Sequence, residues 1–144
     1  MTTIPSSTIE TSSEAQHRLM EDLGRLDETV HQNAETTLTA LRTCLGRTYT
    51  HLCQHFRLKE YDGFLDDLQE REPRFGRIAQ ELFAEHRQLR QSLDSLHGEA
   101  VVAVRVDDAL RGKVRQWIAA LRRHETREDD LIQDAVDLDI AGQD

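Results

Sequence analysis

The chain has 144 residues, of which 31% are charged and only two are proline, and its formal net charge is -9. This length suits one domain with its own core, and the negative charge argues against nucleic acid or an anionic membrane as a partner. No apolar run approaches the roughly 20 residues that span a bilayer, and the N-terminus lacks the basic and apolar blocks of a signal peptide, so we expect a cytoplasmic protein.

The first part of the chain predicts a tail followed by a helix. Residues 1–11 are rich in Ser and Thr and show no periodicity, which is typical of a disordered tail. Ser12, Ser13 and Glu14 are candidate N-caps of the helix. Its buried edge is expected at Met20, Leu23, Leu26 and Val30. His17 lies in the first turns, at the flank of this stripe.

The second predicted helix has an apolar stripe that ends in a histidine. The stripe consists of Leu38, Leu41, Leu45, Thr48, Leu52 and His55. We expect the helix to continue to about Arg71, with Gly63 as a point of bending. Cys44 and Cys53 lie on it about 13 Å apart at 1.5 Å per residue, too far for a disulfide. Both are therefore expected to be reduced thiols.

Pro73 marks the start of the third predicted helix, because proline is favoured in a first helical turn. The apolar stripe of this helix consists of Ile78, Leu82, His86, Leu89, Leu93 and Leu96. Residues 97–106 predict a loop packed on the end of the domain. The last helix is expected at 107–137, capped by Asp107 or Asp108, and residues 139–144 form a C-terminal extension.

The last helix carries the longest stripe of the chain. It consists of Leu110, Val114, Trp117, Leu121, His124, Glu128, Leu131, Ala135 and Leu138. His124 and Glu128 are one turn apart and point to the same side. Burying such a pair without a partner costs several kcal/mol. A bound metal ion would remove that cost.

Four helices with short connections predict an all-α, up-down-up-down four-helix bundle over 12–138. Counting about 1.5 Å per residue from the turns, four histidines from four helices can lie at one level. These are His17, His55, His86 and His124. His31 and His97 fail this test because they lie at the turns. Imidazole and carboxylate ligands inside a bundle suit iron, manganese or zinc.

The histidines stand in four motifs: AQHRLMEDLGRL, HFRLKEYDGFL, LFAEHRQLRQSL and LRRHETREDDLI. These resemble the hemerythrin-like proteins with the HHE cation-binding domain, over nearly the whole chain after the tail. The resemblance implies a non-haem di-iron centre, with two iron ions in preference to manganese or zinc. It implies terminal nitrogen ligands at His17, His55, His86 and His124, and a bridging carboxylate at Glu128.

Two positions depart from the family pattern. The carboxylate expected four residues after His55 is replaced by Lys59, and the nearest acid is Glu60. On a regular helix Glu60 points about 140° from His55 instead of about 40°. A π-bulge would let Glu60 act as the second bridge, whereas without one the ammonium group would repel metal. His51, four residues before His55, is expected at the flank rather than as a ligand.

The second departure is Arg90, in the place of a further histidine of the oxygen-carrying members. The four-histidine pattern is more similar to the branch associated with nitrosative-stress defence and iron–sulfur cluster repair. Fewer nitrogen ligands leave more open coordination positions for a substrate. The ferritin-like pattern is a poor alternative, because its Glu-x-x-His spacing occurs only at His17 and His31, both on the first helix.

Three functions remain open. The first is a protein that binds or reacts with O2, NO or peroxide at a di-iron centre. The second is a di-iron enzyme or iron donor in nitrosative or oxidative stress defence; it would need a protein reductant, since the chain has no flavin or NAD fingerprint and no Cys-x-x-Cys. The third is a metal-free interaction bundle whose site Lys59 has degraded. A sensor would also need a signalling partner.

Overall fold

The computed structural model describes residues 11–31, 37–61 and 64–141, and within these ranges it contains helices and short turns but no strand. The helices are α1 (Ser12–His31), α2 (Leu38–Tyr61), α3 (Phe64–Arg71), α4 (Pro73–Val102) and α5 (Asp108–Ala141). The all-α prediction is therefore confirmed. None of these described helices is long and apolar enough to cross a membrane. The predicted N-terminal tail, apart from Thr11, lies outside the described residues.

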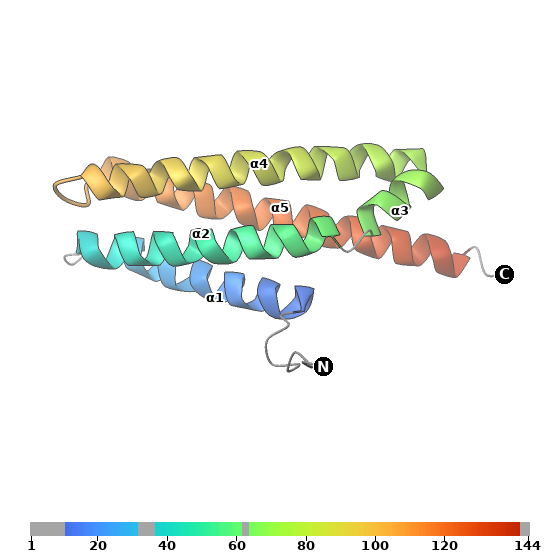
Figure 1. Ribbon diagram of the computed structural model, residues 1–144, viewed down its shortest axis with the longest axis horizontal. Coiled ribbons are helices and arrows are strands. Elements are labelled where there is room, and N and C mark those ends of the chain that lie inside the picture. The colour runs from blue at the N-terminus through green and yellow to red at the C-terminus, as the bar shows by residue number, and fades with distance from the viewer. Residues whose placement is uncertain (1–10, 32–36, 62–63, 142–144) are drawn as a thin grey trace, which may run out of the picture.

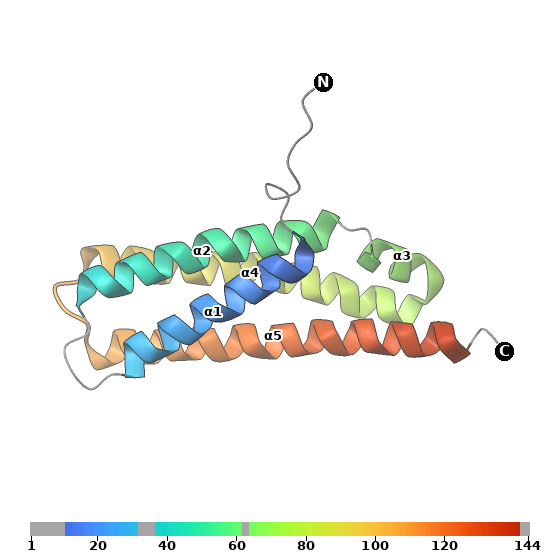
Figure 2. The ribbon, with the colours of Figure 1, turned by 90° about the horizontal axis from the view of Figure 1, so that it is seen from below.

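The four long helices form the predicted bundle. α1 packs against α2, α2 against α4 and α4 against α5, and α5 closes the ring by packing against α1. Successive helices of this ring run in opposite directions (Figure 1). Viewed from below, α1 crosses the bundle obliquely, and α4 and α5 extend past α1 and α2 at the end where α3 lies (Figure 2).

The short helix α3 differs from the predicted layout. A single helix was expected to reach about Arg71, but α2 ends at Tyr61 and a separate helix begins at Phe64. The predicted bend at Gly63 lies outside the described residues. α3 packs against α4, where it buries Leu68. Pro73 then opens α4 as predicted, after a residue in extended backbone conformation.

The connection between α4 and α5 is shorter than the predicted loop at 97–106, because α4 continues to Val102. No proline interrupts this segment, and Arg42 of α2 satisfies its last carbonyl groups. The Arg42 guanidinium donates hydrogen bonds of 2.7, 3.1 and 3.2 Å to the carbonyl oxygens of Ala100, Val101 and Ala103. The end of a helix leaves such carbonyls without intrahelical partners. α5 likewise continues beyond its predicted end, to Ala141.

Side-chain caps fix where three helices begin. Thr11, Thr37 and Asp107 each accept a hydrogen bond from the backbone N–H three residues later, at 3.1, 3.1 and 2.8 Å. Asp107 was one of the predicted caps. Thr11 caps α1 one residue before the predicted Ser12.

The core consists of two apolar clusters with a polar layer between them. The larger cluster takes leucines and other apolar residues from all four long helices. The smaller lies between α3, α4 and α5 and contains Leu68, Phe75, Ala79, Leu82, Leu131 and Ala135. Along α4 and α5 the polar layer separates the two clusters, because His86, His124 and Glu128 fall between their members. The fold therefore places ionisable groups in the middle of an apolar interior.

Candidate metal centre

Five buried ionisable side chains make up the polar layer. They are His55 from α2, His86 from α4, and His124, Glu125 and Glu128 from α5, and none is more than 5% exposed. Each occupies a place on the inward face of its helix where a leucine would otherwise pack. Uncompensated, these groups would destabilise the fold, so their contacts with one another decide what the layer can do.

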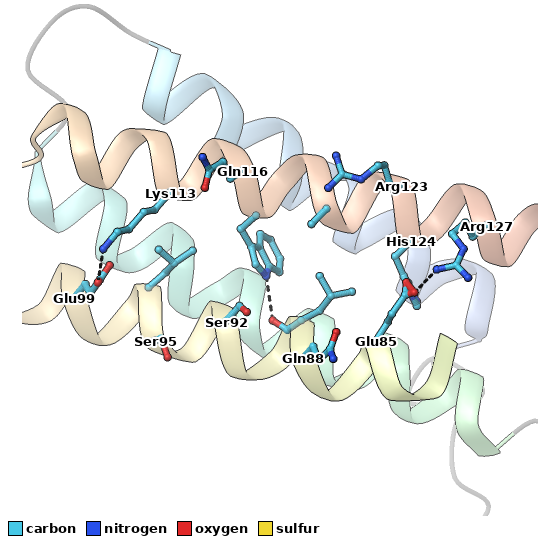
Figure 3. A pocket seen from close by; sticks show the side chains of 14 residues that line it. Glu85, Gln88, Ser92, Ser95, Glu99, Lys113, Gln116, Arg123, His124 and Arg127 are labelled. Atoms are coloured by element: carbon cyan, nitrogen blue, oxygen red, sulfur yellow. Dashed lines mark hydrogen bonds and ion pairs between the residues drawn. The ribbon is translucent and has the colours of Figure 1, made fainter. Parts of the chain in front are cut away.

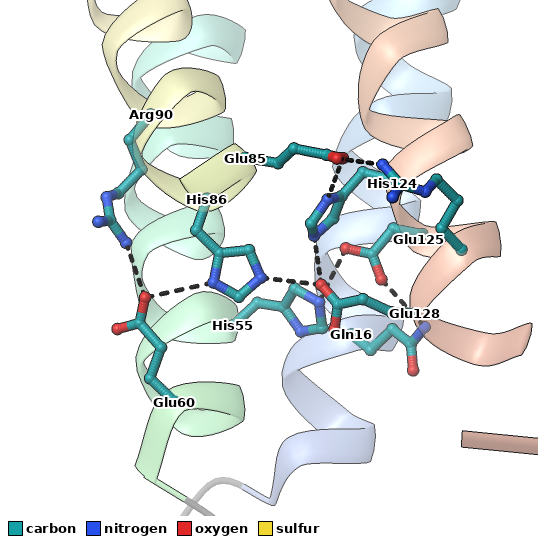
Figure 4. Close-up of polar contacts among 10 residues, drawn as sticks. Gln16, His55, Glu60, Glu85, His86, Arg90, His124, Glu125 and Glu128 are labelled. Atoms are coloured by element: carbon teal, nitrogen blue, oxygen red, sulfur yellow. Dashed lines mark hydrogen bonds and ion pairs between the residues drawn. The ribbon is translucent and has the colours of Figure 1, made fainter. Parts of the chain in front are cut away.

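Glu128 joins two of the histidines. Its Oε1 atom accepts a hydrogen bond from His86 Nε2 at 2.8 Å and also contacts His124 Nε2 (Figure 4). One ligand atom from each of these three side chains lies within 4.8 Å of the other two. Two imidazoles and one carboxylate that converge in this way are a ligand set typical of non-haem iron and other transition metals.

The second nitrogen of each ring contacts a carboxylate outside this triad. His86 Nδ1 lies 3.2 Å from Glu60 Oε1, and His124 Nδ1 lies 3.1 Å from Glu85 Oε1. A metal-binding imidazole commonly donates its other N–H to such an acceptor, which orients the ring and makes the free nitrogen a better ligand.

Arginine side chains hold these two outer carboxylates. Arg90 lies 3.6 Å from Glu60, and Arg127 contacts Glu85. Arg90 therefore supports the site through Glu60. The triad is thus fixed by a second set of polar contacts that continue to the surface.

The charges of the triad are strongly coupled. Burial alone would raise the pKa of Glu128, but hydrogen bonds from His124 and His86 lower that pKa well below its usual range. For His124, burial acts to lower the pKa, but the hydrogen bond to Glu128 and its charge outweigh it and raise the pKa above 6.5. In the metal-free protein Glu128 is therefore a carboxylate, and His124 retains its proton to higher pH than a free imidazole.

His55 forms a second, neighbouring pair. His55 Nε2 donates a hydrogen bond of 2.9 Å to Glu125 Oε1, and Gln16 of α1 donates one of 3.4 Å to the other oxygen of Glu125. The Nδ1 atom of His55 is buried without a hydrogen-bond partner among the described residues. The buried Phe56 ring stacks on that of His86 with centroids 3.9 Å apart, and its centroid lies 5.7 Å from that of the His55 ring.

His17 does not join the cluster. Its side chain is 78% exposed and forms a surface ion pair of 3.0 Å with Glu21. The buried stripe of α1 begins with Ala15 and Leu19 instead of Met20, and at 100° per residue His17 points about 200° from Ala15. The inward-facing polar residue of this turn is Gln16.

Glu60 is close to the cluster but does not face the triad. α2 is a regular α-helix as far as Tyr61, so the π-bulge that would have turned Glu60 inward is absent. Glu60 instead reaches the outer nitrogen of His86 and is 38% exposed at its side chain. Lys59 is half-buried and lies within electrostatic range of Asp129 on α5.

A further polar contact joins α1 to α2. Asp22 is 2% exposed and contacts His51 Nδ1, so His51 has a structural partner rather than a place in the metal cluster. The Asp22 charge, after burial, is also a cause of the raised pKa of Cys44. The sequence predicted His51 at the flank of its helix, which agrees with its partial burial. Asp22 was not predicted, although it lies between Leu19 and Leu26 at the helical spacing that begins with Ala15.

Sequence reasoning also missed Glu125, Gln16 and Glu85. Glu125 could have been found, because Ile118, Leu121, Glu125 and Glu128 form a second stripe beside the one that contains His124. Buried Ile118 shows that the inward face of α5 is this wide. Nothing in the sequence marks Glu85, because its role depends on where α4 meets α5.

Comparison with known proteins assigns no family to this chain: no family model, no curated protein and no solved structure matches it. The candidate function therefore depends on the geometry of the cluster. That geometry provides a buried set of metal ligands beside a second buried histidine–carboxylate pair.

Proposed function

We propose that this chain is a hemerythrin-like, non-haem iron protein that binds or reacts with O2, NO or peroxide. The observation that supports the proposal is the convergence of His86 Nε2, His124 Nε2 and a Glu128 oxygen in the buried layer. A structural network could be built from any polar residues. Two imidazoles that meet a carboxylate, with further carboxylates behind their outer nitrogens, match the surroundings that metal-binding histidines commonly have.

We infer a second iron ion beside the first from the neighbouring His55–Glu125 pair. His55 and Glu125 would hold it, with Glu128 as the shared carboxylate, because these groups occupy adjoining positions in the same layer. The Nδ1 atom of His55 is a further buried polar atom that has no partner among the described residues. In this di-iron centre Glu125 would take the place that the sequence had suggested for Glu60, and Gln16 would hold Glu125 by its hydrogen bond rather than replace His17 as a ligand.

Iron held there would supply open coordination positions and an exchangeable electron. The protein groups do the rest. Phe56 and Phe83 lie against the ring of His86 and limit the access of water. Glu60 and Glu85 keep the two imidazoles in place while a small ligand binds. Any electrons for repeated turnover would come from a partner protein in the cytoplasm.

Metal content tests this proposal. We would load the purified protein with Fe(II) without oxygen, desalt it and measure iron per chain, then record near-ultraviolet and visible spectra with azide, NO or peroxide. About two ions per chain and ligand-dependent bands are expected. Reversible stoichiometric binding would favour a carrier or sensor, whereas sustained turnover with an added reductant would favour the enzyme. A protein that retains no iron would contradict the proposal.

A metal-free interaction bundle is the competing candidate, and two observations favour it. Both ring nitrogens of His86 and of His124 already contact carboxylates, so these rings are satisfied without metal. Half-buried Lys59 also stands where the family pattern has a carboxylate. This candidate predicts that iron and a chelator leave the thermal unfolding temperature unchanged, whereas an iron protein is stabilised by its ligand.

Replacing Glu85 with alanine is expected to weaken iron binding by about 10- to 100-fold, the usual effect of losing a carboxylate behind a metal-binding histidine. The reason is that the His124 ring would lose the acceptor for its Nδ1–H. Competition with a chromogenic chelator measures the affinity. Glu81→Ala is the matched control, because Glu81 contacts the same Arg127 but not His124. Equal losses in the two variants would contradict this role of Glu85.

Replacing Glu125 with glutamine is expected to remove the second iron ion and keep the first. His55 would lose its carboxylate neighbour, while the His86, His124 and Glu128 set would be unchanged. Iron per chain should then fall from about two ions to about one. Asp130→Asn, at an exposed position of the same helix, is the control. If the wild-type protein never held more than one iron ion, the proposed second iron position would be contradicted.

A further inference from the structure

A groove of about 660 Å³ runs along the outer face between α4 and α5 (Figure 3). Its lining residues recur on each helix with helical spacing, so it follows the two helix axes. At one end Lys113 forms an ion pair of 2.8 Å with Glu99, and at the other Arg127 contacts Glu85. This volume falls in the range of about 300–1,000 Å³ that is typical of small-molecule sites.

The surface of the groove is amphipathic. Leu89, Leu96 and Trp117 form its floor, and each is almost completely buried. The hydroxyl side chains of Ser92 and Ser95 stand on the α4 side, where larger residues would fill the space. The Trp117 N–H is already bonded to the Leu89 carbonyl at 3.0 Å, so the indole offers a ligand its apolar surface.

The charge of the groove is opposite to that of the whole chain. Three cationic residues line it, Lys113, Arg123 and Arg127, against two carboxylates, Glu85 and Glu99. The excess of one positive charge stands on a protein whose net charge is -9. Lys113 and Arg127 are paired, whereas Arg123 has no acidic partner in the described part of the chain. The groove is thus complementary to one negative charge.

We propose that this groove binds an amphipathic organic anion, a medium-chain carboxylate, with its acid group at Arg123 and its apolar chain over Trp117 and Leu96. From Arg123 to Lys113 the groove extends about 15 Å at 1.5 Å per residue, a length that accommodates an extended chain such as decanoate. A second copy of the protein is a poorer occupant, because two concave faces related by a two-fold axis leave a cavity between them. This ligand site goes beyond iron binding and does not require it.

Trp117 is the single tryptophan of the chain and lies on the groove floor, so its fluorescence reports occupancy. We would titrate the metal-free protein with decanoate below its micellar concentration. A saturable change is expected, and Arg123→Gln should weaken binding about five-fold, which corresponds to losing an exposed ion pair worth about 1 kcal/mol. Arg122→Gln is the matched control, since Arg122 pairs with Asp27 and does not line the groove.

Two further experiments distinguish binding in the groove from non-specific adsorption. Ser92→Phe should abolish the titration by filling the groove, because Ser92 is exposed and its replacement changes no buried contact. Decylammonium, which has the same chain and the opposite charge, should bind at least five-fold more weakly. No saturable change with decanoate, equal binding of the two amphiphiles, or equal losses in Arg123→Gln and Arg122→Gln would overturn the proposal. Because iron is absent throughout, these outcomes do not depend on the proposed metal centre.

Discussion

Replacing His124 with alanine is expected to abolish iron binding, whereas the same change at His17 is expected to leave it unchanged. His124 is buried and contacts Glu128, the carboxylate that also contacts His86. His17 is exposed on α1 and contacts only Glu21 among the described residues. Removing one of three ligands leaves the first position incomplete for any of the metals considered. The second position, whose own groups are only His55 and Glu125, would then lack the neighbouring ion with which it shares Glu128.

The measurement is iron per chain after loading with Fe(II) and desalting. We expect His17→Ala to match the wild-type protein and His124→Ala to retain almost no iron. Because His124→Ala also leaves a cavity, its helicity must first be shown by circular dichroism to equal that of the wild type. His124→Gln, which fills most of the cavity, should lose iron equally. If His17→Ala lost iron, His17 would be a ligand, as the sequence suggested, and the position of His17 on the exposed side of α1 would be contradicted.

The last helix shows how much of this site the sequence could predict. Its inward positions recur at regular helical spacing from Leu110 to Ala135, so the direction of His124 and Glu128 is fixed by buried apolar residues before and after them on the same face. The same holds for His86 in α4. A long stripe determines the phase of a helix well, and both predicted residues lie in the buried layer.

The first helix shows why His17 was misplaced. Of the predicted stripe, Leu23, Leu26 and Val30 are buried, but the buried face extends from them toward Ala15, Leu19 and Asp22, away from Met20 and His17. The pattern disfavours this phase, because it requires burying Asp22, whose contact with His51 the sequence does not reveal.

Glu60 and Glu125 show a different limit of prediction from the sequence. Whether a carboxylate faces Nε2 or Nδ1 of a histidine depends on how the helices are displaced relative to one another. Glu60 meets the outer side of the His86 ring, and Glu125 meets His55 across the bundle. Helical periodicity gives the direction of a side chain within its own helix, but not the register between two helices.

Replacing Glu128 with glutamine is expected to lower the free energy of unfolding of the metal-free protein by about 3 kcal/mol, the usual cost of removing one partner of a buried ion pair. Glu128 is 2% exposed and accepts from two imidazoles, so the substitution removes the negative charge that both buried rings contact. Urea unfolding with a chelator present, followed by far-ultraviolet circular dichroism, measures the change.

The matched control is Glu21→Gln. Glu21 and His17 have the same residue types and the same i, i+4 spacing as Glu128 and His124, but their side chains are 52% and 78% exposed. An exposed pair of this kind contributes little, at most about 0.5 kcal/mol. Equal effects of the two substitutions would mean that the buried layer does not stabilise the metal-free fold.

The pH dependence of the stability difference between the wild type and Glu128→Gln follows from the pKa shifts of Glu128 and His124. The pKa of Glu128 is lowered in the folded protein, so its contribution is present above pH 4.5 and is lost as the pH falls through the folded value. The pKa of His124 is raised, so its contribution is complete below pH 6.5 and is lost as the pH rises through the folded value. The stability difference between wild type and Glu128→Gln should therefore be largest between pH 4.5 and pH 6.5 and decrease on both sides. In the proposed iron protein, iron bound at His124 would displace the proton retained there, so iron uptake should release protons above pH 6.5, where a free imidazole would release few.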